Sequence, residues 1–438
     1  MKTYNDLYDD IISIPNLLVA FNEAKKGKKS KKFRDFEKNL IQNLNKLHDE
    51  LRQKTYKPSG YSVFYVQDYK RRKVLAPAFR DHVVHHAIFN YLEQIYDPTF
   101  IHTSCACRKG KGTHFGLRTL KSFVNKYSEN DYFIKCDVSK YFYSIDQYKL
   151  KEIIKRKIKD ENVIWLLEQI IDSLTEEKIS AQIDNNSFII QKKGIPIGNL
   201  LSQLFANIYL NELDYFIKHE LKIKHYVRYV DDFVILHKSK TELKKISSEI
   251  KKFLREELFL KLEDRKIQMN KISFGIDFIG YVVFKKYVRV RTRNYRRFRE
   301  KMAQKPKEIW KLFLSFRSYL AHLSHTNSEK IKKRIVAEFI KRAVQRGGNW
   351  DNGANAGPFS ANLNNAPSNR NPNIGFRCCT GFLTAEFSRK SCNIEMHFHP
   401  LSENSENLRR YLQDDLVDSP MKLENFNKIE VKQYEGRK

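Results

Sequence analysis

The segment His-Tyr-Val-Arg-Tyr-Val-Asp-Asp-Phe-Val-Ile-Leu, residues 225–236, places two adjacent acids, Asp231 and Asp232, between two apolar runs. β-Branched and aromatic residues on both sides predict a strand, a turn and a second strand, with the acids at the tip of the hairpin. A separate apolar run, residues 132–138, delivers a third acid, Asp137. Strands that bring acids to one edge of a sheet predict a site for a hard cation such as magnesium, which prefers oxygen ligands.

The charge of the chain is strongly positive and unevenly distributed. Its 438 residues include 81 Lys and Arg against 51 Asp and Glu, a net charge of +30. Residues 346–438 hold 12 basic and 11 acidic residues, so +29 belongs to residues 1–345. Such an excess predicts a polyanionic partner, either nucleic acid or an anionic membrane surface, for the first three-quarters of the chain.

The sequence favours a cytoplasmic protein without a membrane anchor. No apolar stretch approaches the roughly 20 residues that span a bilayer. The N-terminus lacks the order of basic, apolar and small residues that is typical of a signal peptide. Six Cys without framework spacing fit a reducing compartment.

Helix and strand patterns alternate along the chain. Apolar spacing of three and four residues predicts helices at residues 33–55, 82–96, 147–174, 201–213, 241–258 and most of 305–345. Hairpins are predicted at residues 61–76, with a basic tip, and within residues 274–290. Helices mixed with strands around a central hairpin predict an α+β fold, in which helices cover an antiparallel sheet.

A group of arginines follows the last predicted strand. Arg289, Arg291 and Arg293 alternate with smaller residues, so a strand would place all three on one face. Arg296 and Arg297 extend the group. The large positive charge favours a track that binds the phosphate backbone of a nucleic acid. The alternative is an edge strand that charge protects from pairing with other strands.

The composition changes at Gly347. Nine Asn fall between residues 349 and 373, and no apolar periodicity continues there. A segment of this kind cannot bury a core of its own. We therefore place a domain boundary near residue 345.

Three carboxylates beside a basic track are what nucleotidyl transfer needs, since they can hold two metal ions roughly 3.5–4 Å apart. The order of these blocks over about residues 30–345 resembles a reverse transcriptase. The resemblance implies a right-hand polymerase fold in which the palm carries the acids. The implied parts are an N-terminal helix and fingers at 1–130, a palm at 131–284, a thumb at 285–345, an Asn-rich segment at 346–379 and an unassigned tail at 380–438. The last two segments would form a poorly structured extension.

The resemblance also implies roles for individual residues. Asp137, the backbone carbonyl of Val138, Asp231 and Asp232 would hold two Mg²⁺ ions, with Mn²⁺ as an alternative. Arg72 would hold the triphosphate of the incoming nucleotide, and Lys70 and Arg71 would assist it. Phe142 would exclude a 2′-hydroxyl. Ile197 and Gly198 would lie under the new base pair. The implied substrates are template RNA, a primer or growing cDNA, and dNTPs.

One departure points to a subtype. Most reverse transcriptases have Gln-Gly where this chain has Ile197-Gly198, and Ser-Pro where it has Ser202-Gln203. This combination resembles the residues at the same positions in the reverse transcriptases of diversity-generating retroelements. Those enzymes copy a template-repeat RNA and misincorporate opposite adenine. The resulting cDNA then overwrites a variable region of a target gene. Ile197 cannot donate the hydrogen bond of a glutamine side chain, so checking of the base pair should weaken. Alternatively, Ile197 only packs against the following helix.

The extension allows the same interpretation. Residues 346–377 resemble the end of a C-type-lectin-like fold, the usual place of variable regions in these elements. Our hypothesis is that the reading frame runs into the template repeat, so the Asn codons are adenine-rich; the alternative is an Asn-rich linker. The resemblance further implies a separate basic accessory protein.

The rival functions are a group II intron, retron or phage-defence reverse transcriptase, and a non-catalytic RNA-binding or splicing cofactor on a polymerase scaffold.

Overall fold

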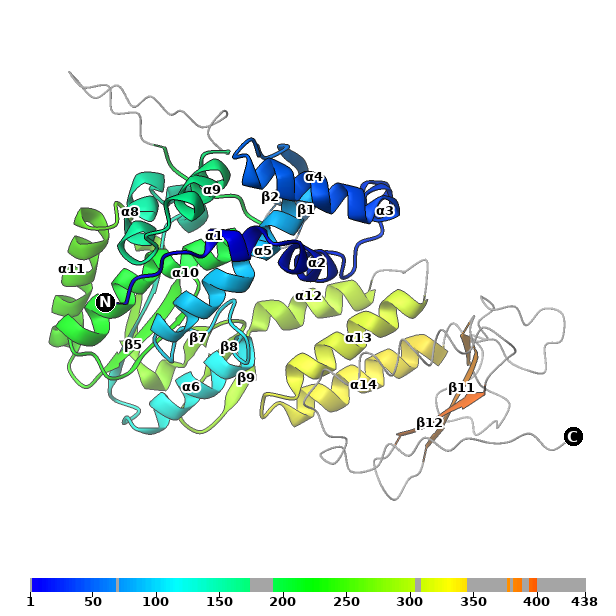
Figure 1. The fold of residues 1–438 in the computed structure, drawn as a ribbon. Coiled ribbons are helices and arrows are strands. Elements are labelled where there is room, and N and C mark those ends of the chain that lie inside the picture. The colour runs from blue at the N-terminus through cyan, green and yellow to red at the C-terminus, as the bar shows by residue number, and fades with distance from the viewer. Residues whose placement is uncertain are drawn as a thin grey trace, which may run out of the picture. The chain divides into compact units, whose positions relative to one another are not determined.

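The computed structural model describes residues 2–67, 71–173, 192–303 and 309–344, together with three strands between residues 376 and 399. The chain divides into two units, Met1–Tyr287 and Val288–Lys438. The elements of each unit are labelled in Figure 1.

A four-stranded antiparallel sheet forms the centre of the first unit, with the strand order β4-β5-β3-β6. Its strands are β3 (Tyr132–Asp137), β4 (Tyr226–Tyr229), β5 (Asp232–His237) and β6 (Gln268–Lys271). The four residues from Phe233 to Leu236 on β5 are all buried, although their side chains alternate between the two faces. Both faces of the sheet are therefore covered, as the predicted α+β fold requires.

Helices and two hairpins surround this sheet (Figure 1). The elements before the sheet are α1 (Tyr8–Ile12), α2 (Ile14–Ala24), α3 (Lys31–Lys38), α4 (Leu40–Arg52), β1 (Tyr61–Gln67), β2 (Arg71–Pro77), α5 (Phe79–Tyr96), η1 (Asp97–Thr99) and α6 (Thr113–Asn125). Those that follow β3 are α7 (Tyr141–Ser144), α8 (Gln147–Lys157), α9 (Glu161–Asp172), α10 (Leu200–Tyr215), η3 (Phe216–Glu220), α11 (Lys240–Glu256), η4 (Asp264–Lys266), η5 (Ile272–Phe274), β7 (Ile276–Phe278) and β8 (Tyr281–Val283).

Two predicted helices are each divided in the structure. The helix expected at 33–55 is broken at Asn39, whose φ of −115° and ψ of 41° are not helical. The helix expected at 147–174 ends at Lys157, because Asp160 begins a second helix by accepting hydrogen bonds from the N–H groups of Asn162 and Val163. Apolar periodicity continues across both breaks, so it did not reveal them.

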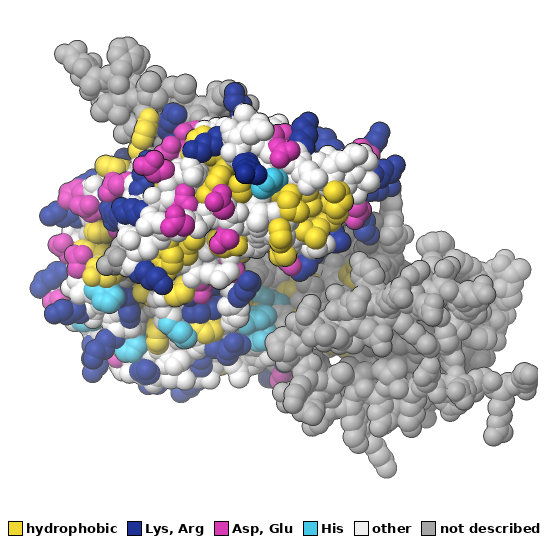
Figure 2. All heavy atoms as spheres, viewed as in Figure 1, with side chains coloured by type: hydrophobic (Ala, Val, Ile, Leu, Met, Phe, Trp, Pro, Cys, Tyr) yellow, Lys and Arg dark blue, Asp and Glu magenta, His cyan; other side chains and the backbone are white. Residues whose placement is uncertain are grey.

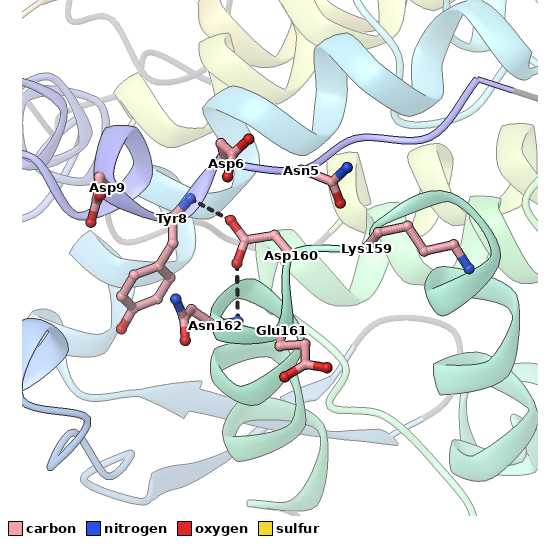
Figure 3. Close-up of a pocket in the computed structure, with 8 residues that line it drawn as sticks. All are labelled: Asn5, Asp6, Tyr8, Asp9, Lys159, Asp160, Glu161 and Asn162. Atoms are coloured by element: carbon pink, nitrogen blue, oxygen red, sulfur yellow. Dashed lines mark hydrogen bonds between the residues drawn. The ribbon is translucent and has the colours of Figure 1, made fainter.

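Asp160 also fixes the N-terminal segment. Its carboxylate accepts hydrogen bonds of 2.8 Å from the backbone N–H groups of Leu7 and Tyr8. Figure 3 shows Asp160 between the N-terminal segment and the first turn of α9, beside a pocket of about 480 Å³. The pocket is lined by Asn5, Asp6, Tyr8, Asp9, Lys159, Asp160, Glu161 and Asn162. Because four backbone N–H groups donate hydrogen bonds to the Asp160 carboxylate, we interpret Asp160 as a structural residue that joins the N-terminal segment to α9.

The second unit begins with β9 (Val288–Val290) and three helices, α12 (Thr292–Ala303), α13 (Ile309–Leu323) and α14 (Glu329–Val344). Phe298 of α12 stacks on Tyr319 of α13 with ring centroids 4.1 Å apart. In the extension, where the sequence predicted little structure, β10 (Phe376–Cys378), β11 (Gly381–Phe387) and β12 (Ile394–His399) form an antiparallel sheet. In the described part of the chain, no helix is both long and apolar enough to cross a membrane.

Candidate functional site

The three predicted acids meet at one edge of the central sheet. β3 and β5 pair antiparallel, and Asp137 lies directly opposite Asp232. Asp231 occupies the turn between β4 and β5, where its carbonyl accepts a hydrogen bond of 3.3 Å from the N–H of Val138. Two stretches almost a hundred residues apart in the sequence thus bring Asp137, Val138, Asp231 and Asp232 together.

Two lysines that the sequence analysis did not single out bind these acids. Lys135 Nζ lies 3.0 Å from Asp232 Oδ2 and donates a hydrogen bond of 2.7 Å to the carbonyl of Asp277. Lys266 of η4 forms an ion pair with Asp137. The Lys135 side chain is only 12% exposed, whereas that of Lys266 is 54% exposed. Lys135 is therefore largely buried and held by two partners, whereas Lys266 is paired with Asp137 at the surface.

Two of the three carboxylates form ion pairs with lysines. Within the described ranges, no group of three or more His, Cys, Asp or Glu side chains is gathered as a metal-binding cluster. Lysine ammonium groups instead provide the positive charge at Asp137 and Asp232. The backbone pairing brings the three acids to one edge of the sheet, and two of them form ion pairs with lysines.

Asp232 nevertheless has the properties of a cation ligand. Its Oδ1 atom is buried and has no hydrogen-bond partner among the described residues. Burial, with smaller contributions from Asp137 and Asp231, raises the pKa of Asp232 to about 7, although Lys135 opposes the shift. A buried, uncoordinated carboxylate oxygen beside two further acids fits a divalent cation with oxygen ligands.

The residues expected under the new base pair pack against the β1–β2 hairpin. The carbonyl of Ile197 accepts a hydrogen bond of 3.1 Å from the N–H of Leu75 on β2. The preceding segment is joined to α7, because the N–H of Ile195 donates a hydrogen bond of 2.8 Å to the carbonyl of Phe142. The structure therefore links three of the predicted nucleotide-contacting segments through their backbones.

The remaining nucleotide-contacting residues are described only in part. Arg71 and Arg72 lie on β2, the strand that binds Ile197, but their side chains lie outside the described atoms. Lys70 lies outside the described residues altogether. Their contact with a triphosphate stays a prediction.

Gly198 provides a test of this packing. It has a φ of 100°, and a Cβ atom there would lie 2.6 Å from Cγ1 of Val74, a β-branched side chain with little rotamer freedom. Gly110 also has a positive φ, of 69°, but a Cβ there would meet nothing within 4 Å. In urea unfolding, we expect Gly198→Ala to destabilise the protein by about 1 kcal/mol more than Gly110→Ala, since only Gly198→Ala adds a steric clash. Equal losses would contradict the packing of this turn on β2.

The prediction that the arginines share one face of a strand was wrong. β9 ends at Val290 and α12 begins at Thr292. Phe298 is buried against Tyr319, and burial at this position favours a helix in which the arginines remain outside. Arg289 is an exposed residue of β9, and Arg291 lies between the two elements. Arg293, Arg296 and Arg297 are exposed on α12 at spacings of three and four residues, which place them on one side of the helix.

The surface charge of the described residues is mixed. On the face shown in Figure 2, Lys and Arg side chains are interspersed with Asp and Glu side chains. The net charge of the chain predicts a polyanionic partner, but the mixed charge on this face does not show where that partner binds.

Comparison with known proteins agrees with this geometry. Residues 67–283, which include all three acids, match the family described as reverse transcriptase (RNA-dependent DNA polymerase). The chain carries a reverse transcriptase domain. This match identifies residues 67–283 as a domain of the RNA-directed DNA polymerase type, as the sequence predicted.

The known proteins that this chain is similar to match it only in part. It is 26% identical over 284 residues to YkfC of Escherichia coli (strain K12), spanning 56% of this chain and 72% of YkfC. It is 25% identical over 303 residues to the group II intron-encoded protein LtrA of Lactococcus lactis subsp. cremoris, spanning 54% of this chain but only 49% of LtrA. Among solved structures, apo telomerase from Candida Tropicalis aligns with a TM-score of 0.38 and 15% identity, covering 68% of this chain and 61% of the telomerase chain.

Proposed function

We propose that this reverse transcriptase extends a primer along an RNA template by two-metal nucleotidyl transfer at Asp137, Asp231 and Asp232. The observation that carries the proposal is the pairing of Asp137 with Asp232 beside the Asp231 turn. The carboxylates and the Val138 carbonyl would hold the Mg²⁺ ions. When bound, these ions would activate the primer 3′-hydroxyl and stabilise the leaving pyrophosphate.

The other residues of the site prepare it for the substrates. Lys135, held by Asp277, stays beside Asp232 and limits repulsion between the acids. Lys266 neutralises Asp137 in the free enzyme, and its exposed side chain would release that carboxylate to a bound divalent ion. Phe142 excludes a 2′-hydroxyl, and Arg72, with Lys70 and Arg71, binds the triphosphate. The arginines at the start of the second unit, Arg289, Arg291, Arg293, Arg296 and Arg297, bind phosphates of the template and product strands.

The direct test is primer extension on an RNA template with Mg²⁺ and each dNTP supplied alone. Template-directed addition of deoxynucleotides supports the proposal. RNA binding without extension would instead favour the non-catalytic RNA-binding cofactor.

We further propose that synthesis is error-prone at template adenines, as in a diversity-generating retroelement. The support is the sequence Ile197-Gly198 followed by Ser202-Gln203. The carbonyl of Ile197 accepts a hydrogen bond from Leu75 of β2, the strand that also carries Arg71 and Arg72. Because the Ile197 side chain is apolar, it gives no hydrogen bond that depends on correct base-pair geometry.

Replacing Ile197 with Gln should restore such a hydrogen bond. We expect Ile197→Gln to lower misincorporation opposite adenine about tenfold, which corresponds to one additional hydrogen bond of about 1.4 kcal/mol. Sequencing of cDNA copied from one defined RNA measures this directly, and Ile195→Val, a change next to the turn, is the matched control. An unchanged error spectrum would mean that Ile197 only packs against its neighbours.

The retroelement proposal also concerns residues 346–375, which lie outside the described residues. If the reading frame enters a template repeat there, the DNA contains a near-identical copy elsewhere that differs at adenines. The absence of such a copy would argue against this subtype and against a separate basic accessory protein as partner.

A group II intron reverse transcriptase is the second candidate. It is favoured by the similarity to LtrA, an intron-encoded protein, and to an uncharacterized 91 kDa protein in the cob intron of Schizosaccharomyces pombe, which is 33% identical over 141 residues. That match covers 32% of this chain and 16% of the yeast protein. Accurate copying of adenine would favour this candidate, or a retron or phage-defence enzyme, over the retroelement.

A further inference from the structure

The turn that carries Asp231 has a backbone conformation that is unfavourable for its sequence. Val230 has a φ of 56°, in the left-handed region that β-branched residues rarely adopt. Asp231 is not among the residues with positive φ. A two-residue hairpin turn with positive φ at its first central position alone normally has glycine there. Contacts around Val230 must therefore hold it in place.

Both carbonyls of this turn accept hydrogen bonds. A guanidinium nitrogen of Arg228, Nη1, donates to the Val230 carbonyl at 2.9 Å. The N–H of Val138 donates to the Asp231 carbonyl at 3.3 Å. The bond from Arg228 comes from a side chain and acts directly on the strained residue.

Arg228 is itself rigidly held. It is completely buried, and its Nε and Nη2 atoms donate to the two carboxylate oxygens of Asp214 at 2.7 and 2.5 Å. Nη1 also donates to Asn207 Oδ1 at 3.3 Å. The backbone of Arg228 is bound on both sides, by the carbonyl of Thr103 and the N–H of Cys105. A planar guanidinium fixed in this way presents one N–H group to the Val230 carbonyl in a defined direction.

We propose that Arg228 is a positioning residue, which uses its ion pair with Asp214 to hold the Val230 carbonyl and thereby keep the Asp231 turn in its strained conformation. The inference rests on the proposed catalytic function of that turn. Arg228 contacts neither substrate nor metal in this role, because its side chain is completely buried. A lysine at this position could neutralise Asp214 but could not bind Asp214 and Val230 with the same fork of donors.

The test combines Arg228→Lys with Val230→Gly. Glycine adopts positive φ without penalty, so the turn of the Val230→Gly variant should depend less on Arg228. In wild-type background, we expect Arg228→Lys to raise hydrogen–deuterium exchange of residues 229–233 and to lower kcat for primer extension, each about tenfold, as for loss of one charge-assisted hydrogen bond. In the Val230→Gly background, kcat should fall less than about threefold. Equal losses in both backgrounds, or unchanged exchange of the turn, would overturn the proposal.

Tyr226→Phe is the matched control. It removes the hydrogen bond of 2.7 Å from Tyr226 Oη to Asp214 in the same buried cluster, but leaves the bond to Val230 intact. We expect a lower Tm with normal kcat and normal exchange of the turn. If Arg228→Lys does not fold, Asp214→Asn should raise exchange of the turn in the same direction, and no rise would again contradict the role of Arg228. Exchange needs no substrate, so it tests the turn even if the wild-type enzyme fails to extend a primer.

Discussion

Asp231→Asn should reduce primer extension at least about a thousandfold while leaving the fold intact, since loss of a metal-binding carboxylate removes several kcal/mol of transition-state stabilisation. Asn has nearly the same shape as Asp, and its backbone carbonyl can still accept the hydrogen bond from Val138. The loss should therefore come from the missing charge. Steady-state kinetics on an RNA template measure it, and thermal unfolding verifies that the variant is folded.

Glu249→Gln provides the control for this prediction. Glu249 is an exposed acid on α11, so its replacement removes one negative charge away from the sheet edge. We expect wild-type activity from this variant. An Asp231→Asn enzyme that retains more than a tenth of wild-type kcat would contradict the two-metal proposal.

Asp232→Asn should stabilise the metal-free protein relative to the wild type more at pH 8 than at pH 5. The pKa of Asp232 is about 7 in the folded protein, against an ordinary value of 3.8, chiefly because the group is buried. Folding thus favours the protonated acid, so wild-type stability falls as the pH rises from about 4 and stops falling once the pH has passed about 7. Asn remains neutral throughout, so the variant should gain about 2 kcal/mol over wild type between pH 5 and pH 8, after allowance for partial exposure.

Magnesium should oppose this gain at pH 8. An ion that binds only the folded wild type stabilises it, whereas the Asp232→Asn variant lacks one of the ligands. Urea unfolding at both pH values, with and without Mg²⁺, gives the four free energies of unfolding for each protein. If the difference in free energy of unfolding between the two proteins does not change with pH, Asp232 is not held in a protonated state. If Mg²⁺ has no effect on that difference, this counts against a metal at this carboxylate.

Local patterns identified most of the elements but not their ends. The apolar runs around Asp231 and Asp232 gave the β4–β5 hairpin, because such runs favour strands wherever they occur. The helix breaks at Asn39 and Asp160 were missed, since neither the backbone turn at Asn39 nor the side-chain cap at Asp160 interrupts the apolar periodicity. The alternation of Arg289, Arg291 and Arg293 predicted a strand where α12 begins. Arg289 does lie on β9, but the strand ends at Val290, and Phe298 of the helix that follows stacks on Tyr319.

The sequence by itself determined the α+β fold class, the hairpin with its paired acids and the third acid on a separate strand, because these depend on residue types that are close together in the chain. Only the tertiary structure decided which cations face the acids and what holds the turn. Lys266 meets Asp137 across 129 positions of sequence, and Arg228 reaches Val230 only because Asp214 of α10 fixes its guanidinium. Such contacts form when distant segments pack together, and local sequence spacing does not encode them.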